Sequence, residues 1–247
     1  MKNKIIKVKI RAYNVLGDNM NHKRLLALLL CLVIIASSKI VTINTDSVQV
    51  KDVINNTEEY KIENISEEDD NKKVNIFYPV TEYESVNNVI NKKIDYYRSK
   101  FDNSNFTTDK KKLEISFEEY EYKEYRSFKF IIKSNVGISH DIEEIFTVSF
   151  KGDTVIDIDY FKQKNKDILD LFYSECYNKL KDDTNIKQYS SEEWLNKGLQ
   201  KDSDNYKNFI FTEDAFVIIF NSYTIAPYVA GIFEVEIPYD NLSLVLN

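Results

Sequence analysis

Histidine, cysteine and glycine are scarce in this sequence of 247 residues, and each shortage excludes a class of site. Of the two histidines and two cysteines, only His140 and Cys176 lie beyond residue 41, which is too few ligands for a Cys/His zinc site. The five glycines form neither a phosphate-binding loop nor a nucleophile elbow. We therefore expect a protein without catalytic residues, without a metal and without a cofactor.

Two features that resemble catalytic groups have simpler explanations. His140 stands alone in a polar turn, where a histidine is far more often a surface residue than a general base. The neighbours Glu118 and Glu119 imitate the carboxylate pair of a glycosidase, but in a chain with 40 acidic residues solvated strand faces explain them better. No disulfide can form beyond residue 41, because Cys176 is the single thiol there.

The N-terminal tail is basic and the rest of the chain is acidic. Residues 1–24 carry a net formal charge of +6, which leaves −13 for residues 25–247 from a total of −7. An acidic body disfavours binding of nucleic acid and attracts a basic partner protein. A surface that serves solubility alone would carry the same charge.

Long apolar runs are also rare, and the strongest one covers residues 25–38. This uncharged run is shorter than a bilayer span of about 20 residues and is typical of a signal peptide. Ala36 and Ser38 stand where signal peptidase recognises small side chains, which predicts cleavage after Ser38. Alternatively, residues 25–41 form a single membrane-spanning anchor with a basic inner end. Both alternatives place the rest of the chain outside the cytoplasm, and a start at Met20 would give a compact signal peptide.

The next segment, residues 42–73, is poor in large apolar residues and is expected to be a stalk or linker. Within it, residues 47–54 alternate enough to add a strand. A folded ectodomain then follows in two parts, residues 74–150 and residues 151–247.

Apolar periodicity predicts clustered strands and a few helices in the ectodomain. The expected strands lie near residues 74–80, 113–117, 128–132, 142–150, 154–158, 208–211, 215–220 and 232–237, and the expected helices near 85–101, 167–181 and 190–199. Pro79 is expected to end the first strand, and Ser190 with Glu193 forms a possible capping box. Because strands cluster instead of alternating with helices, the predicted fold is α+β, an antiparallel sheet with helices packed on one face, preceded by a signal or anchor segment.

The loop of residues 221–231 is unusual because it is apolar and aromatic, whereas loops between strands are normally polar. It carries Tyr223, Ile225, Pro227 and Tyr228. Such a loop is either packed against the sheet or kept for a partner. On composition alone both alternatives stay open.

The pattern N-x-Y-x-I-A-P-Y-x-A-G in this loop, followed by a strand that ends I-P-Y-x-x-L, resembles the C-terminal extracytoplasmic domain of RsiV-type anti-sigma factors. The same module precedes the catalytic domain of PdaC-type peptidoglycan deacetylases. The similarity is closest at residues 211–242 and extends over most of residues 74–247. It implies an α+β ectodomain on the outer face of a Gram-positive cell.

In the RsiV branch the resemblance further implies binding of a basic, lysozyme-type muramidase, with Tyr223, Ile225, Pro227 and Tyr228 as the contact residues. Binding there licenses signal peptidase cleavage and release of a sigma factor. A full anti-sigma factor would hold its sigma factor through residues 1–24, which are short, basic and weakly patterned. A cell-wall glycan-binding module is the other alternative.

Overall fold

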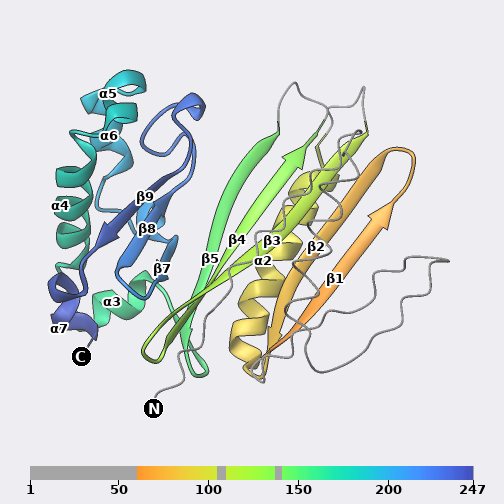
Figure 1. Ribbon diagram of the computed structural model, residues 1–247, viewed down its shortest axis with the longest axis horizontal. Helices are drawn as coiled ribbons and strands as arrows, with labels where there is room; N and C mark the ends of the chain where they lie inside the picture. Colours follow the sequence, from red (N-terminus) through yellow and green to blue (C-terminus); the bar gives the residue numbers. More distant parts are fainter. Residues whose placement is uncertain (1–59, 105–109, 137–140, 247) are drawn as a thin grey trace, which may run out of the picture. The chain divides into compact units, whose positions relative to one another are not determined.

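The computed structural model of the chain describes residues 60–104, 110–136 and 141–246 (Figure 1). All of them belong to one compact unit, Val53–Asn247. Several expectations lie outside the described residues: those for the tail 1–24, for the segment 25–41 with Ala36 and Ser38, for linker residues 42–59 and for His140. In the described ranges no helix is both long and apolar enough to cross a bilayer.

The first six strands form one sheet in chain order. They are β1 (Tyr60–Glu68), β2 (Lys72–Thr81), β3 (Lys111–Tyr122), β4 (Tyr125–Asn135), β5 (Ile142–Lys151) and β6 (Thr154–Ile156). Neighbouring strands are antiparallel except β2 and β3, which run parallel because helix α2 (Glu84–Asp102) connects them. The predicted α+β class is confirmed, and one parallel pair makes this larger sheet mixed.

The folded part begins earlier than the sequence indicated. Residues 60–68 were expected to be linker, but they form β1, which pairs along its length with β2. Pro79 does not end β2, since the strand continues to Thr81. A proline fits there because pairing with β3 stops at Ile76, so one edge of β2 needs no donor beyond that point.

Helix α2 covers one face of the larger sheet. Its buried positions Val86, Ile90, Ile94 and Phe101 follow helical spacing and pack against inward residues of the strands. On the sheet, the rings of Phe130 and Phe146 stack with centroids 4.2 Å apart. Each such buried side chain contributes about 1.5–3 kcal/mol, so this core holds the sheet without disulfides.

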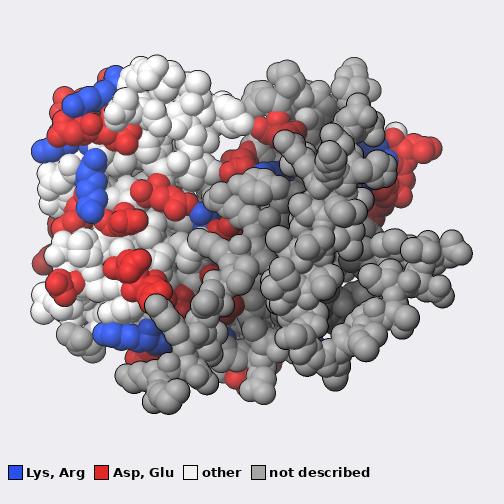
Figure 2. All heavy atoms as spheres, in the orientation of Figure 1, with Lys and Arg blue, Asp and Glu red and all other residues white. Residues whose placement is uncertain are grey.

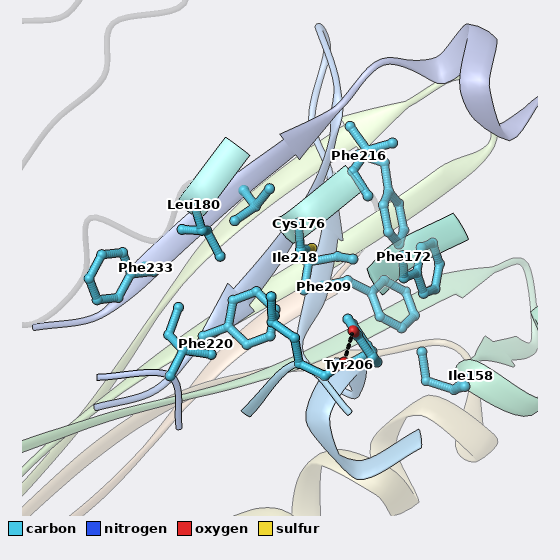
Figure 3. Close-up of a cluster of buried hydrophobic side chains, with 14 of the residues drawn as sticks. Ile158, Phe172, Cys176, Leu180, Tyr206, Phe209, Phe216, Ile218, Phe220 and Phe233 are labelled. Atoms are coloured by element: carbon cyan, nitrogen blue, oxygen red, sulfur yellow. Dashed lines mark hydrogen bonds between the residues drawn. The ribbon is translucent and has the colours of Figure 1, made fainter. Parts of the chain in front are cut away.

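The second sheet is smaller and antiparallel, in the order β7 (Phe209–Phe211), β8 (Phe216–Phe220) and β9 (Phe233–Ile237). Helices α3 (Ile158–Lys164), α4 (Ile168–Leu180), α5 (Thr184–Tyr189) and α6 (Glu192–Gly198) follow the larger sheet, and the chain ends in helix α7 (Ser243–Leu246). Figure 3 shows the core between the smaller sheet and these helices, where Phe172 stacks on Phe216 beside the buried Cys176. The helix expected near residues 190–199 is α6, whereas α3, α5, α7 and the division into two sheets were not predicted.

Side-chain hydrogen bonds at β7 link the two sheets. The backbone N–H of Phe209 donates to Thr147 Oγ1 at 3.0 Å, and that of Phe211 donates to Ser127 Oγ at 2.9 Å. Ser149 Oγ donates to the carbonyl of Phe209 at 3.1 Å. One edge of β7 is therefore satisfied by hydroxyl groups of β4 and β5 in place of another strand.

Candidate functional site

The loop of residues 221–231, called the aromatic loop below, joins β8 to β9 and is half buried and half exposed. Ile225 and Ala226 are 0% and 1% exposed and belong to the core beneath the helices. In contrast, Tyr223 and Val229 are 64% and 66% exposed, the largest exposures among its apolar side chains. Both alternatives for the loop are thus realised in different residues of one segment.

One side of the aromatic loop is fixed to β5. The side chain of Asn221 accepts a hydrogen bond from the backbone N–H of Ile145 at 2.7 Å and donates to the carbonyl of the same residue at 2.8 Å. At the other end, Tyr228 Oη donates to the carbonyl of Asp141 at 2.6 Å. These contacts join residues that are 76 and 87 positions apart, so the loop is attached to the larger sheet as well as to its own.

The other side of the aromatic loop is fixed to the helices. Ser190 Oγ donates to the carbonyl of Ile225 at 2.9 Å. Ser190 is therefore not the cap of α6, as the sequence suggested; Ser191 is the cap and accepts from Trp194 N at 3.1 Å. The spacing of a capping box fits two adjacent serines nearly equally. Ser191 caps the helix, and Ser190 holds the loop instead.

Gly198, at the end of α6, lets the helix approach the aromatic loop closely. A Cβ atom at this position would collide with the backbone carbonyl of Thr224 and would lie 2.8 Å from Ile225 Cγ2. Any side chain here requires the loop to move, because a backbone carbonyl cannot rotate away as a side chain can. No pattern in the sequence indicates this contact.

The backbone of the aromatic loop is held in uncommon conformations. Tyr223 has φ of 68°, in the left-handed region that costs a bulky residue roughly 1–2 kcal/mol. A hydrogen bond from Tyr223 N to the carbonyl of Ala226, at 3.0 Å, helps to hold Tyr223 in this conformation and offsets part of the cost. Gly231 closes the loop with φ of 82° and ψ of −156°, a region open essentially to glycine. An exposed aromatic residue is thus fixed in a strained backbone.

Of the four predicted contact residues, three reach the surface. Tyr223 is exposed, Pro227 and Tyr228 are partly exposed, and the two tyrosine rings lie 5.9 Å apart. Ile225 is wrong as a contact residue, because it is fully buried and anchors the loop from below. Val229 was missed, although it lies in the same apolar run; composition cannot tell which residues of such a run face outward.

Charged side chains flank the aromatic loop. Figure 2 shows an uncharged area over the loop, with acidic side chains at the start of β5 and both acidic and basic side chains over α5 and α6. Exposed acids at these places include Asp141, Glu192 and Glu193. The arrangement is an apolar, rigid loop with a charged rim, which suits recognition of a surface more than a chemical reaction.

The comparison with protein families identifies the module that contains this site. Residues 158–240 match the family model described as "Protein of unknown function (DUF3298)". These residues include α3 to α6, all three strands of the smaller sheet and the aromatic loop, so the match covers the segment that carries the candidate site. A comparison with curated proteins gave no match.

Two solved structures described as DUF3298 family proteins match this chain. A DUF3298 family protein from Pseudomonas aeruginosa PAO1 matches with a TM-score of 0.52 and 13% identity, over 76% of this chain and 93% of that chain. A member of the DUF3298 family from Bacteroides fragilis matches with a TM-score of 0.49 and 15% identity, with the same shares covered. At this identity the Pseudomonas match shows a shared fold and nothing about a ligand.

Proposed function

We propose that this chain is a non-enzymatic, extracytoplasmic binding protein whose aromatic loop binds a basic, lysozyme-type muramidase and thereby senses or inhibits it. The observation that carries the proposal is the exposure of Tyr223 and Val229 on a loop that is fixed by hydrogen bonds on both sides. The DUF3298 match at residues 158–240 supports it, since RsiV-type domains belong to that family.

The rigidity of the aromatic loop favours binding over mere packing. Association costs free energy for each side chain and loop that must be ordered, and a loop already held in place avoids much of that cost. Tyrosine also buries a large area while only two torsions are fixed, which is why tyrosines are frequent among residues that dominate binding energy. The strained backbone at Tyr223 fits the same interpretation, because strain of this kind is concentrated at functional sites.

Charge supports a basic partner. Residues 25–247 carry a net charge of −13, and acidic side chains lie near the uncharged area over the loop, at the start of β5 and among the charged residues of α5 and α6 (Figure 2). Opposite charges steer two proteins toward each other and raise the association rate, particularly at low ionic strength. An apolar loop with this rim is suited to enter the concave substrate cleft of a basic enzyme.

The N-terminal part of the chain is proposed to direct export or membrane anchoring. We infer that residues 25–41 serve as a signal peptide or a single anchor and that the DUF3298 domain acts outside the cytoplasm. Signalling to a sigma factor would additionally require residues 1–24 to hold that factor. Binding by the aromatic loop does not depend on this second role.

The test is a calorimetric titration of the purified full-length chain with a C-type lysozyme at low and at physiological salt. We expect saturable binding that weakens with salt, and inhibition of the muramidase at equal concentrations. Absence of binding heat at low salt, together with no retention of the chain on immobilised lysozyme, would contradict the proposal. Binding to purified peptidoglycan in the absence of lysozyme would favour a glycan-binding module instead.

A further inference from the structure

A groove of about 370 Å³ runs along β9, and we call it the acidic groove. Its residues come from the C-terminal end of α4, from the segment around Asp214 and from both faces of the smaller sheet. Strand β9 supplies four consecutive residues, Phe233 to Glu236. Four carboxylates line it, Asp183, Asp214, Glu234 and Glu236, against the single lysine Lys179. Apolar residues, among them Val217 and Phe233, also line it.

Strand β9 lies at the open edge of its sheet. The strand order is β7-β8-β9, and in the described part of the chain β9 pairs with β8 alone. An edge strand exposes backbone N–H and C=O groups that can pair with a further extended segment. Because β9 forms part of the groove wall, a segment lying in the groove would run beside these groups.

The carboxylates alternate along β9 with buried apolar residues. Glu234 and Glu236 are exposed, whereas Phe233, Val235 and Ile237 are buried. Glu234 is paired with the Nζ of Lys129 from β4, so a basic side chain of a bound segment would share this carboxylate with Lys129. Figure 2 shows acidic side chains gathered on this face, over β9 and α4, below the uncharged area over the aromatic loop.

We propose that the acidic groove is a docking site for an extended, lysine- or arginine-rich segment of a partner protein, which adds to the open edge of β9 as a further strand. The backbone of the segment pairs with β9, and its alternate basic side chains face Glu234 and Glu236. Main-chain hydrogen bonds to β9 would provide affinity for the segment, and the carboxylates would provide its selectivity for basic side chains.

This inference goes beyond binding through the aromatic loop and does not require the partner to be a muramidase. The two surfaces are linked in the chain, because β9 begins two residues after the loop ends at Gly231. A partner with a cleft for the loop and a basic extended segment beside that cleft would contact both. The loop variants and the groove variants therefore test separate surfaces.

The experiment uses the full-length chain and a blocked peptide of alternating lysine and threonine. Hydrogen–deuterium exchange followed by mass spectrometry reports protection of residues 233–237, and calorimetry at low salt reports affinity. We expect slower exchange in β9 on addition of the peptide. The double variant Glu234→Gln/Glu236→Gln should bind about tenfold more weakly, since each exposed ion pair contributes a factor of a few.

Two controls separate strand addition from general attraction. The variant Glu82→Gln/Glu114→Gln removes the same charge at exposed positions outside the groove and should bind as the unaltered chain does. A peptide with the same lysines but alternate N-methylated residues should fail to protect β9. Equal binding of the methylated peptide, or equal weakening by both double variants, would overturn the proposal, as would protection of β9 that appears only on self-association of the chain.

Discussion

The Gly198→Ala substitution should displace the aromatic loop while the rest of the fold stays intact. The added Cβ atom collides with the backbone carbonyl of Thr224 and approaches Ile225 Cγ2 to 2.8 Å. Overpacking of this kind costs about 1–3 kcal/mol. Alanine in place of glycine within a helix regains about 1 kcal/mol. We therefore expect a net loss of about 0–2 kcal/mol in the free energy of unfolding.

The effect on binding should exceed the effect on stability, because the collision is directed at the loop. Urea unfolding measures the effect on stability, and titration with a C-type lysozyme measures the effect on binding. Lys197→Ala, one position earlier on the exposed side of α6, is the matched control and should change neither by much. Unchanged lysozyme affinity in Gly198→Ala would refute the argument that the position of the loop determines binding.

Further predictions concern stability and ionisation. Ile225→Ala should lower the free energy of unfolding by about 2–5 kcal/mol in urea melts, since the side chain is fully buried. Ser127→Ala should cost about 1–3 kcal/mol, because the N–H of Phe211 loses its acceptor between the sheets, and faster amide exchange at that residue would reveal it. Burial raises the pKa of the Cys176 thiol and of the Tyr97 hydroxyl, so both are neutral in the folded chain. Stability should therefore be intact below about pH 8.5 and fall as the pH rises toward 11, measured by urea melts at each pH. A thiol reagent should modify native Cys176 only on unfolding.

Much of the fold can be predicted from the periodicity of apolar residues in the sequence. Alternating apolar residues locate the inner parts of β3 and β4 and nearly the whole of β5, and the spacing of Val86, Ile90 and Ile94 identifies the buried face of α2. These patterns are strong because one face of each element is buried and the other is solvated. The α+β class follows from their order.

The parts that could not be predicted depend on contacts between distant residues. Strand β1 has no buried apolar stripe, and its pairing with β2 defines it, so its sequence resembles a linker. The sequence also cannot show that Ser190 holds the loop while its neighbour Ser191 caps α6. Likewise, the need for glycine at residue 198 arises from the loop and not from the helix.

The candidate site was predictable as a segment but not residue by residue. Its aromatic composition identified the loop of residues 221–231, and Tyr223 lies at the surface as that prediction requires. The buried state of Ile225 and the exposure of Val229 depend on how the loop folds over α5 and α6. Loop residues have no fixed period, so the inward and outward sides cannot be read from the sequence.

The central claim is tested most directly by the ratio of lysozyme dissociation constants between Tyr223→Ala and Tyr96→Ala. Tyr96 is a matched control, since it is 59% exposed on α2 and Tyr223 is 64% exposed on the loop. We predict that Tyr223→Ala weakens binding by about 2 kcal/mol, roughly 30-fold, with an unchanged urea midpoint, and that Tyr96→Ala has no effect. Equal affinities for the two variants would contradict the account.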